Sequence, residues 1–529
     1  MPRSQPIARM SMICRGLPID REELFLYTNG HFLVDEHRQL NRRYLKFDID
    51  ALCDVGATAG GDSSGVVTIE KFEGGFSKAL LIKTHNGKEV IAKMPCRIAG
   101  PPSLTTAAEV GALKYLREYT SIPVPRVLSW SADSANPVGA EYVIMEKAEG
   151  VPLYQQWGKM AEIEKLELIR NLTKLEAQLS AISFPAYGGL YYRTNTTQFN
   201  SEVLDETIDS SGLFAVGPSC ERSFNTDPAA DVPLPAGDID QGPWRTISSF
   251  GVSIVKRELS RMNNKHLRGE LMFYEGSDEE KVHLLEATER LMPEFDSHPL
   301  LHHSSQPTLW HTDLHMGNIF VAPDENSRIV SLIDFQSVSV LPLFLQAQWP
   351  VFLKPPQNYT KGLVQPKLPD DFDQLDDEYQ AIARQEWTQA KLAKAYEVAT
   401  FLENRAAHNA MNIPRVFREF FYALRACLIE IYQNWSSLAF TGECPYSFSE
   451  EEIARHELQF SEYEAWHEVQ KLAQECLDTD AEGWISPLLD IEEKRRQNKE
   501  LLAMYTQRVG GEKTPEEAKA MWPFPEIGC

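Results

Sequence analysis

Long hydrophobic runs are missing from this sequence of 529 residues. The longest apolar stretch, residues 340–353, is interrupted by Pro342, Gln346, Gln348 and Pro350. It is too short and too polar to cross the roughly 30 Å hydrocarbon core of a bilayer, so we expect no membrane-spanning segment. Internal repeats and long low-complexity tracts are also absent, and the hydrophobic content of 43% is typical of a globular protein.

Cysteine and positive charge are both scarce. The chain has 8 cysteines and no Cys-x-x-Cys spacing, which favours reduced thiols over a disulfide framework or a zinc site. Its 52 lysines and arginines are outnumbered by 76 aspartates and glutamates, so the net charge is −24. Nucleic-acid binding requires a cationic surface, and a nucleic-acid partner is therefore not expected. A bulk polyanionic substrate is also disfavoured, although a local pocket can override the average charge.

The local patterns predict an α+β protein with two lobes, because the chain is too long for one ordinary core. A helical lead-in is expected at residues 21–65, followed by a small β-rich N-lobe at 66–147. A large helical C-lobe is expected at 148–369, and its helical C-terminal extension at 370–529.

Within these regions, alternating residues predict strands and longer periodicity predicts helices. In the small lobe we expect four strands and one helix, at residues 66–69, 79–83, 89–94, 142–145 and 104–119. Residues 194–245 are rich in Gly, Pro, Ser and Asp, and we expect an irregular excursion outside the core. Residues 415–435 form the most apolar helical segment, which should lie in the core.

Residues 311–336 carry the most informative motif, His-Thr-Asp-Leu-His-Met-Gly-Asn followed by an apolar segment that ends in Ile-Asp-Phe-Gln. Phosphoryl transfer from ATP needs a carboxylate to deprotonate the attacking hydroxyl and hard oxygen ligands to hold Mg²⁺ on the phosphates. Asp313 is the predicted base, and Asn318 and Asp334 are the predicted Mg²⁺ ligands. We expect His311 to support the loop through backbone hydrogen bonds.

A hairpin should bring the two predicted metal ligands together. Residues 318–321 and 328–333 are apolar strand segments, and residues 324–327 have the composition of a turn. The pattern therefore predicts that the start of the first strand and the end of the second lie close together.

A second predicted element is a phosphate-facing turn between two strands. Gly74, Gly75, Phe76 and Ser77 follow the strand at 66–69, and glycines allow a backbone to approach phosphates closely. Ser77 is a candidate phosphate donor. Neither of the two common glycine-rich phosphate-loop patterns is present, and an ordinary hairpin can also carry two glycines.

A lysine and a glutamate form the third predicted element. Ile91 and Lys93 share one strand face, so Ile91 could cover an adenine while Lys93 reaches the phosphates. Glu109 lies on the apolar stripe of the helix at 104–119, where an unpaired carboxylate is costly to bury. Lys93 is its predicted partner, in the pairing that fixes the phosphate-binding lysine of kinases.

The segment that should connect the lobes follows the strand at 142–145. Backbone groups of Glu146 to Ala148 are the predicted partners of the adenine edge. The position of this segment, between Glu109 and Asp313 in the chain, supports this interpretation over an ordinary strand end.

With all these motifs in order, the sequence resembles the aminoglycoside phosphotransferase family of the protein-kinase-like superfamily, over about residues 70–350. It also resembles, over most of its length, the fungal group of that family called altered inheritance of mitochondria protein nine. This second similarity is carried by residues 25–30, 100–102, 122–127 and 139–142.

The resemblance implies a two-lobed kinase-like fold, ATP and Mg²⁺ as cofactors, and transfer of phosphate to a hydroxyl of an unidentified small molecule. Aminoglycoside specificity does not carry over, because the 194–245 excursion and the long helical tail are additions to the compact antibiotic kinases. Two alternatives stay open: a nucleotide-binding scaffold without turnover, and transfer of AMP to a protein.

The resemblance also implies a mitochondrial location, with the cytoplasm as the alternative. Arg3, Arg9 and Arg15 precede the first acidic residue, Asp20, and this composition is compatible with a transit peptide over residues 1–20.

Overall fold

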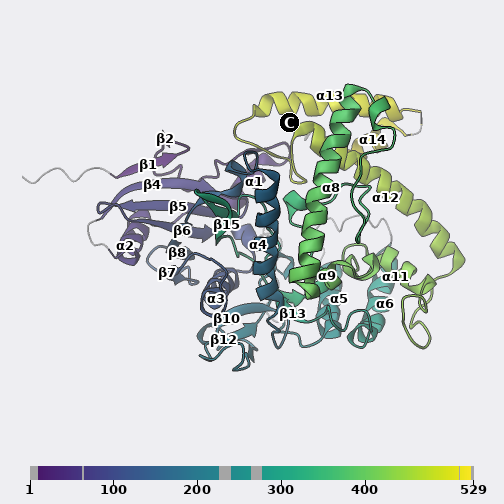
Figure 1. The fold of residues 1–529 in the computed structure, drawn as a ribbon, viewed down its shortest axis with the longest axis horizontal. Helices are drawn as coiled ribbons and strands as arrows, with labels where there is room; N and C mark the ends of the chain where they lie inside the picture. Colours follow the sequence, from purple (N-terminus) through teal and green to yellow (C-terminus); the bar gives the residue numbers. More distant parts are fainter. Residues whose placement is uncertain (1–9, 62–64, 225–239, 264–276, 512, 526–529) are drawn as a thin grey trace, which may run out of the picture.

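The computed structural model describes residues 10–61, 65–224, 240–263, 277–511 and 513–525. A β-rich lobe lies beside a larger, mostly helical lobe (Figure 1), which confirms the predicted α+β, two-lobed, protein-kinase-like fold. The predicted division at residues 66–147, 148–369 and 370–529 stays a prediction. Within the described parts of the chain, no helix combines the length and apolar character needed to cross a bilayer.

The small lobe is built on a seven-stranded sheet with the order β2-β1-β4-β5-β6-β8-β7. Its strands are β1 Ser11–Cys14, β2 Leu17–Pro18, β4 Val66–Glu73, β5 Ser77–Thr84, β6 Glu89–Pro95, β7 Val127–Ser131 and β8 Tyr142–Glu146. Neighbouring strands are antiparallel except β1 and β4, which are parallel. All four predicted strands are present, and helix α3 (Leu104–Tyr119) has the predicted bounds.

The predicted helical lead-in at residues 21–65 is only partly helical. Its described residues contain the short strand β3 (His31–Phe32) and the helices α1 (Glu36–Arg43) and α2 (Ile49–Ala59). Of the predicted transit peptide, residues 1–9 lie outside the described residues, and residues 11–18 contain β1 and β2.

A buried charge cluster explains why the chain before β3 is not helical. Oε1 of Glu73 lies 3.2 Å from Nζ of Lys71 and 2.5 Å from Nζ of Lys78. Its Oε2 accepts hydrogen bonds from the amide and hydroxyl of Thr28, at 2.8 and 2.9 Å. Both lysines donate to the carbonyl oxygen of Leu26. The backbone here is therefore committed to charged side chains of β4 and β5 instead of helical hydrogen bonds.

The helical lobe follows the small lobe. Its helices of seven or more residues are α4 Glu162–Ser180, α5 Ile247–Asn263, α6 Asp278–Asp296, α8 Asp377–Glu403, α9 Arg405–Met411, α11 Leu424–Gln433, α12 Glu450–Leu477, α13 Ile491–Val509 and α14 Pro515–Met521. The segment at 415–435 contains α10 (Arg415–Arg418) and α11, and it is in the core as predicted. It is not one helix, because residues 419–423 interrupt it.

The prediction that residues 194–245 lie outside the core is wrong for their described part. Strand β12 (Phe214–Gly217) is fully buried between β10 (Gly189–Tyr192) and β11 (Glu202–Val203). Trp244 packs in the main core as well. The apolar run in β12 is short and isolated in the sequence, so only its tertiary partners reveal that it is buried.

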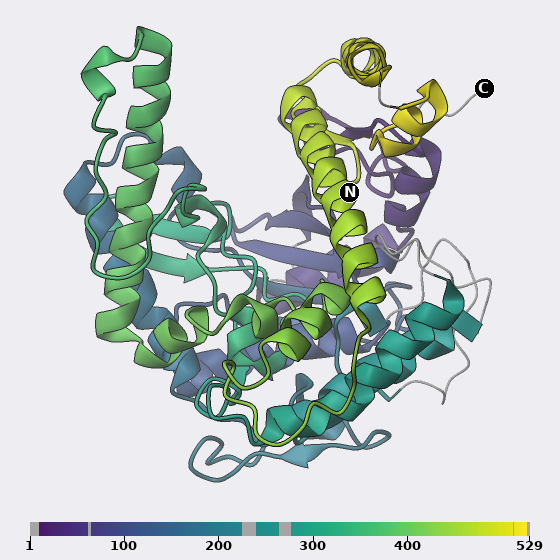
Figure 2. The same ribbon diagram turned by 90° about the vertical axis from the view of Figure 1, so that its right-hand side faces the viewer.

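The C-terminal extension returns to the small lobe. Strand β17 (Trp484–Ile485) pairs with β3, and Nη2 of Arg495 on α13 lies 2.6 Å from a carboxylate oxygen of Glu36. Figure 2 shows the yellow helices α13 and α14 beside the purple N-terminal elements. The C-terminal extension therefore packs against β3 and α1, which precede the main strands of the small lobe.

We expect Glu73→Gln to destabilise the protein by about 3–5 kcal/mol, because it leaves two buried ammonium groups without a counter-charge. Chemical denaturation monitored by tryptophan fluorescence measures the change. Glu70→Gln, on the same strand and only partly buried, is the matched control. Equal unfolding midpoints for the two variants would contradict a structural role for the cluster.

The stability of the fold should depend on pH through Glu176, which lies on α4 in the helical lobe. This carboxylate is 3% exposed and accepts a hydrogen bond from the hydroxyl of Tyr396 on α8, at 2.9 Å. Burial raises its pKa from 4.5 to about 8. The folded state then binds a proton that the unfolded state releases above pH 4.5, so this carboxyl destabilises the fold progressively between pH 4.5 and about 8.

Glu176→Gln is permanently neutral, so its stability should fall less than that of the wild type between pH 5 and 8. Thermal unfolding across this range measures the difference. The exposed Glu167→Gln on the same helix should behave like the wild type. Parallel pH profiles for Glu176→Gln and the wild type would show that Glu176 ionises normally in the fold.

Candidate active site

The predicted catalytic loop, residues 311–318, connects β13 (Pro307–Leu309) to β14 (Ile319–Ala322). Nδ2 of the buried Asn318 donates to the carbonyl oxygen of Asp313 at 2.9 Å. The side-chain oxygen Oδ1 of Asn318 takes no part in this bond. The Asp313 side chain is 66% exposed. The loop backbone is thus fixed from inside, while the carboxylate faces solvent.

His311 supports the loop, as predicted. The amide of Asp313 donates to Nδ1 of His311 at 3.3 Å, so the proton lies on Nε2, which donates to the carbonyl oxygen of Ile333 at 2.9 Å. Burial lowers the pKa of His311, which favours this neutral form. One imidazole therefore connects the predicted base to the residue before Asp334.

The hairpin of β14 and β15 (Glu325–Leu332) forms, but its turn is shorter than predicted. Ala322 already pairs with Glu325, so residues 323–324 alone connect the strands, and the expected turn at 324–327 is wrong. Register shifts within the pair accommodate the extra residues. The amide of Ile333 donates to the carbonyl oxygen of Asn318 at 3.0 Å, so the hairpin places the backbone of Asn318 beside the residue that precedes Asp334.

Lys93 on β6 makes the predicted contact with Glu109 on α3, and it contacts Asp334 as well. Its Nζ lies 2.6 Å from a carboxylate oxygen of each. Lys93 and Glu109 are buried, at 8% and 3% exposure, so the cation is shared between two carboxylates with little water. This contact joins the small-lobe sheet and its helix to the segment that follows the catalytic hairpin.

The charges of this group depend on one another. Burial alone lowers the pKa of Lys93, but the carboxylates of Asp334 and Glu109 outweigh it and raise the pKa to about 12. Burial would raise the pKa of Asp334, and the Lys93 ammonium group nevertheless holds it below its usual value. Burial raises the pKa of Glu109, against the opposing effect of Lys93. Lys93 and Asp334 are thus a charged pair at neutral pH.

The backbone at Asp334 is unusual. Its φ of 66° lies in the left-handed region, and Ser337 has a φ of 61°. Residues other than glycine adopt such angles at a cost, although aspartate tolerates them better than most. This geometry turns the chain sharply after β15, so that the Asp334 carboxylate reaches Lys93.

The predicted phosphate-facing turn connects β4 and β5. The amide of Gly74 donates to the carbonyl oxygen of Ser77 at 3.1 Å, and a Cβ added at Gly74 or Gly75 would meet no atom within 4 Å. The glycines therefore face open space, where a ligand could approach their backbone. Ser77 is buried at the start of β5, and Phe76 lies at the tip of the turn.

The remaining predicted nucleotide contacts lie around β8. Ile91 pairs with Met145 and Lys93 with Val143, which places Ile91 and Lys93 on one strand face as expected. The amide of Glu146 donates to the carbonyl oxygen of Arg126 at 3.0 Å, so this predicted donor is committed to the fold. The prediction for the adenine edge then depends on the irregular segment 147–149, which contains Ala148.

Two arginines near the turn were not identified from the sequence. Nε of the buried Arg43 on α1 donates to the carbonyl oxygen of Gly75 at 3.0 Å, and its Nη2 lies 2.5 Å from Glu482. The guanidinium of Arg222 lies over the ring of Phe76, 3.2 Å from its centroid. Arg43 belongs to a recognisable basic run, whereas Arg222 lies in the 194–245 excursion without any local signal.

With this geometry established, comparison with known proteins identifies the family. Residues 68–344, just over half of the chain, match the sequence profile of the phosphotransferase enzyme family. The chain belongs to this family. A subtelomeric hrmA-associated cluster protein of Aspergillus fumigatus is 31% identical to this phosphotransferase-family chain over 462 residues, which cover 78% of the chain and 88% of that protein.

The predicted relationship to a fungal mitochondrial group is also found. Altered inheritance of mitochondria protein 9 of Yarrowia lipolytica is 23% identical over 499 residues, covering 84% of this chain and 82% of that protein. Among solved structures, a putative aminoglycoside phosphotransferase of Ralstonia eutropha is similar with a TM-score of 0.35 and 13% identity. It covers 74% of this chain and 96% of its own.

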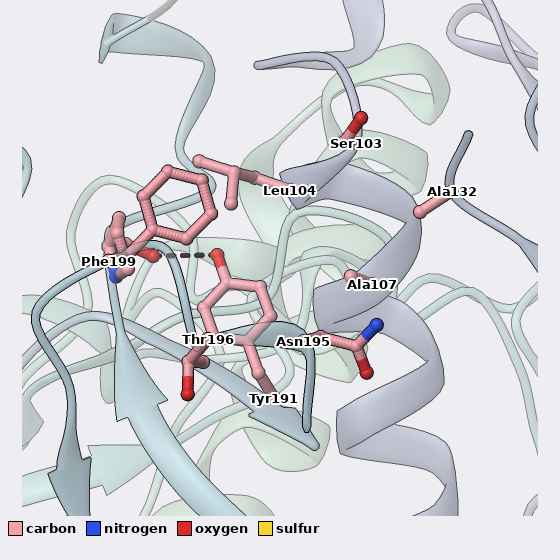
Figure 3. A pocket seen from close by; sticks show the side chains of 9 residues that line it. Ser103, Leu104, Ala107, Ala132, Tyr191, Asn195, Thr196 and Phe199 are labelled. Atoms are coloured by element: carbon pink, nitrogen blue, oxygen red, sulfur yellow. Dashed lines mark hydrogen bonds between the residues drawn. The ribbon is translucent and has the colours of Figure 1, made fainter. Parts of the chain in front are cut away.

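A separate small pocket lies on the outer side of α3 (Figure 3). It is lined by Ser103, Leu104, Ala107, Ala132, Tyr191, Asn195, Thr196, Phe199 and Pro218. The Tyr191 hydroxyl at its wall donates to the carbonyl oxygen of Pro218 at 2.6 Å. None of the predicted site residues lines this pocket, so it is distinct from the Lys93 and Asp313 region.

We expect Lys93 and Glu109 to act as one unit in nucleotide binding. Lys93→Met and Glu109→Gln should each weaken Mg·ATP binding, because either change misplaces the other group. The double variant should then bind hardly worse than the weaker single variant, since groups that act together are strongly non-additive. Isothermal titration calorimetry of the four proteins gives the coupling, and additive losses would show that the contact does not serve the nucleotide.

Proposed function

We propose that this chain is an ATP- and Mg²⁺-dependent phosphotransferase that phosphorylates a hydroxyl of a small molecule. The proposal is carried chiefly by one observation. Lys93 is held at 2.6 Å by both Glu109 and Asp334, while the backbone of Ile333 connects Asp334 to the loop that presents Asp313. A cation for phosphates, an acidic metal ligand and an exposed carboxylate thus meet in one region.

The residues have distinct roles in the proposed reaction. Lys93 would bind the α- and β-phosphates, and Glu109 would hold its ammonium group in place. Asp313 would orient the acceptor hydroxyl and take its proton, and its exposed side chain is accessible to such a group. The turn from Gly74 to Ser77 would cover the phosphates with its backbone.

The donors present fit Mg²⁺. The amide oxygen of Asn318 and the carboxylate of Asp334 are hard oxygen ligands, and the bond from Ile333 to Asn318 keeps their backbones adjacent. Bound there, Mg²⁺ would neutralise charge on the phosphates. The depressed pKa of Asp334 supports this assignment, because a ligand carboxylate must be ionised.

The relatives of the chain suggest where in the cell it is located. We propose a mitochondrial location from the proteins named altered inheritance of mitochondria protein 9, with the cytoplasm as the alternative. Fluorescent tagging of the full chain at its C-terminus tests this proposal. Cytoplasmic fluorescence would contradict it.

A single experiment tests the reaction class. The purified chain is incubated with Mg·ATP and a library of small metabolites, and phosphorylated products are detected by mass spectrometry. A gain of one phosphate on a hydroxyl compound supports the proposal. An AMP adduct on protein would instead favour nucleotide transfer, and tight ATP binding without any product would favour a scaffold.

We expect Asp313→Asn to lower turnover by about 10²–10⁴-fold, the usual effect of losing a general base. Its Mg·ATP dissociation constant should stay close to that of the wild type, because within the described residues Asp313 forms no ion pair with Lys93, and its carboxylate lies nearest to His315. The matched control is Asp324→Asn, an exposed aspartate in the turn of the same hairpin. Wild-type turnover in Asp313→Asn would refute its assignment as the base.

A further inference from the structure

We propose that Arg222 of the 194–245 excursion binds the phosphoryl group as it is transferred, an inference that rests on the proposed phosphotransferase function. The excursion thereby supplies a catalytic residue to the site. Within the described part of the chain, three sets of contacts hold this arginine and the segment that carries it.

The first contact is with the phosphate-facing turn. The Arg222 guanidinium lies 3.2 Å from the ring centroid of Phe76, at the tip of the turn between β4 and β5. A guanidinium stacked on a ring keeps its in-plane N–H donors free for another partner. Arg222 remains exposed, so these donors are accessible to a bound anion.

The second set of contacts fixes the segment that carries Arg222. Nη1 of Arg257 on α5 donates to the hydroxyl of Ser223 at 2.9 Å, and Nη2 of Arg261 donates to its carbonyl oxygen at 2.7 Å. On the other side, Sγ of Cys220 donates to the carbonyl oxygen of Val338 at 3.4 Å. Arg222 thus lies on a short segment held between α5 and the chain that follows Asp334.

The third set of contacts joins that segment to the end of the small-lobe sheet. The Ser337 hydroxyl donates to the carbonyl oxygen of Ala99 at 3.0 Å, and the position of a Cβ at Gly100 would be 3.0 Å from the carbonyl oxygen of Cys220. Gly100 has a φ of 155°, which favours glycine, and a Cβ there would also lie 2.5 Å from Oγ1 of Thr105. The turn after β6, the segment before Arg222 and the chain after Asp334 therefore meet tightly.

The carboxylates that act electrostatically on Arg222 include the predicted base, Asp313, and a predicted metal ligand, Asp334. Surrounding protein desolvates the guanidinium and lowers its pKa, and the carboxylates of Asp313, Asp334 and Glu482 oppose this shift. An arginine stays protonated regardless. Arg222 is thus within electrostatic range of both the predicted base and the predicted metal ligand, between which the γ-phosphate and the acceptor hydroxyl would meet. We therefore favour the phosphoryl group over a distant part of the nucleotide as its partner.

In the proposed step, the acceptor oxygen forms a bond to the γ-phosphorus and the bond from that phosphorus to the β-bridging oxygen breaks. The hydroxyl proton passes to Asp313, and ADP leaves with the electron pair of the broken bond. Negative charge shifts within the transferring group during this step. Arg222 would stabilise the transferring group more strongly than it stabilises bound ADP, which is the signature of a transition-state contact.

The test compares two probes on Arg222→Ala: Mg·ADP alone, and Mg·ADP with aluminium fluoride, which mimics the phosphoryl group in transfer. We expect the variant to bind Mg·ADP like the wild type and to bind the aluminium fluoride complex about 10²–10³-fold more weakly, the range found for a lost transition-state donor. Its Mg·ATP hydrolysis, with water as the acceptor, should fall by a similar factor. Arg222→Lys should recover part of both losses, since it keeps the charge without the planar fork.

Arg245→Ala is the matched control, because Arg245 lies at the other end of the excursion and its exposed side chain pairs with Glu202 at 2.7 Å. It should leave both probes and the hydrolysis rate unchanged. Equal weakening of both probes in Arg222→Ala would show that Arg222 only shapes the nucleotide site, and would overturn the inference. Unchanged binding of both probes would also overturn the inference. The remaining partner for Arg222 would then be an anionic group of the acceptor molecule.

A different result would refute the proposed function itself. If the wild-type chain binds no Mg·ATP, the phosphotransferase proposal and the inference about Arg222 fall together. If the wild type binds and hydrolyses ATP while the Arg222 variants match it, only the inference about Arg222 is wrong.

Discussion

The Lys93 ammonium group lies 2.6 Å from the carboxylates of both Glu109 and Asp334, and through it three distant parts of the chain share one charge. A buried cation needs compensation on every side, so β6, α3 and the turn after β15 must keep their relative positions for the contact to persist. This one interaction joins the small-lobe sheet to the chain after the loop that carries Asp313. It also holds Asp334 ionised, which the proposed role as a metal ligand requires.

The turn between β4 and β5 is itself held by buried charge. Glu73, immediately before Gly74, is fixed by Lys71, Lys78 and the backbone of residue 28, while Arg43 holds the carbonyl of Gly75. The turn is thus held by charged side chains, while the Cβ positions of Gly74 and Gly75 face open space. The segments before β4 and after α12 have a clear role in this arrangement, since they supply these partners.

The C-terminal extension and the 194–245 excursion reach the turn between β4 and β5 from two directions. The C-terminal extension reaches the turn through Glu482, which pairs with Arg43. The excursion reaches it from the other lobe through Arg222, which stacks on Phe76. Both contacts converge on residues 75–76, so two segments far apart in the chain meet at the predicted phosphate-facing turn.

The sequence by itself determined four strands of the small lobe, helix α3, the predicted catalytic loop and the partnership of Lys93 with Glu109. These features depend on short-range patterns: alternation in β4 to β6, helical spacing around Glu109, and the fixed distance from Asp313 to Asn318. Tertiary structure alone decided the rest. The burial of β12, the non-helical course of residues 24–30 and the positions of Arg43 and Arg222 depend on partners up to several hundred residues away. No local pattern specifies such a contact, because its energy comes from groups that meet only after the chain has folded.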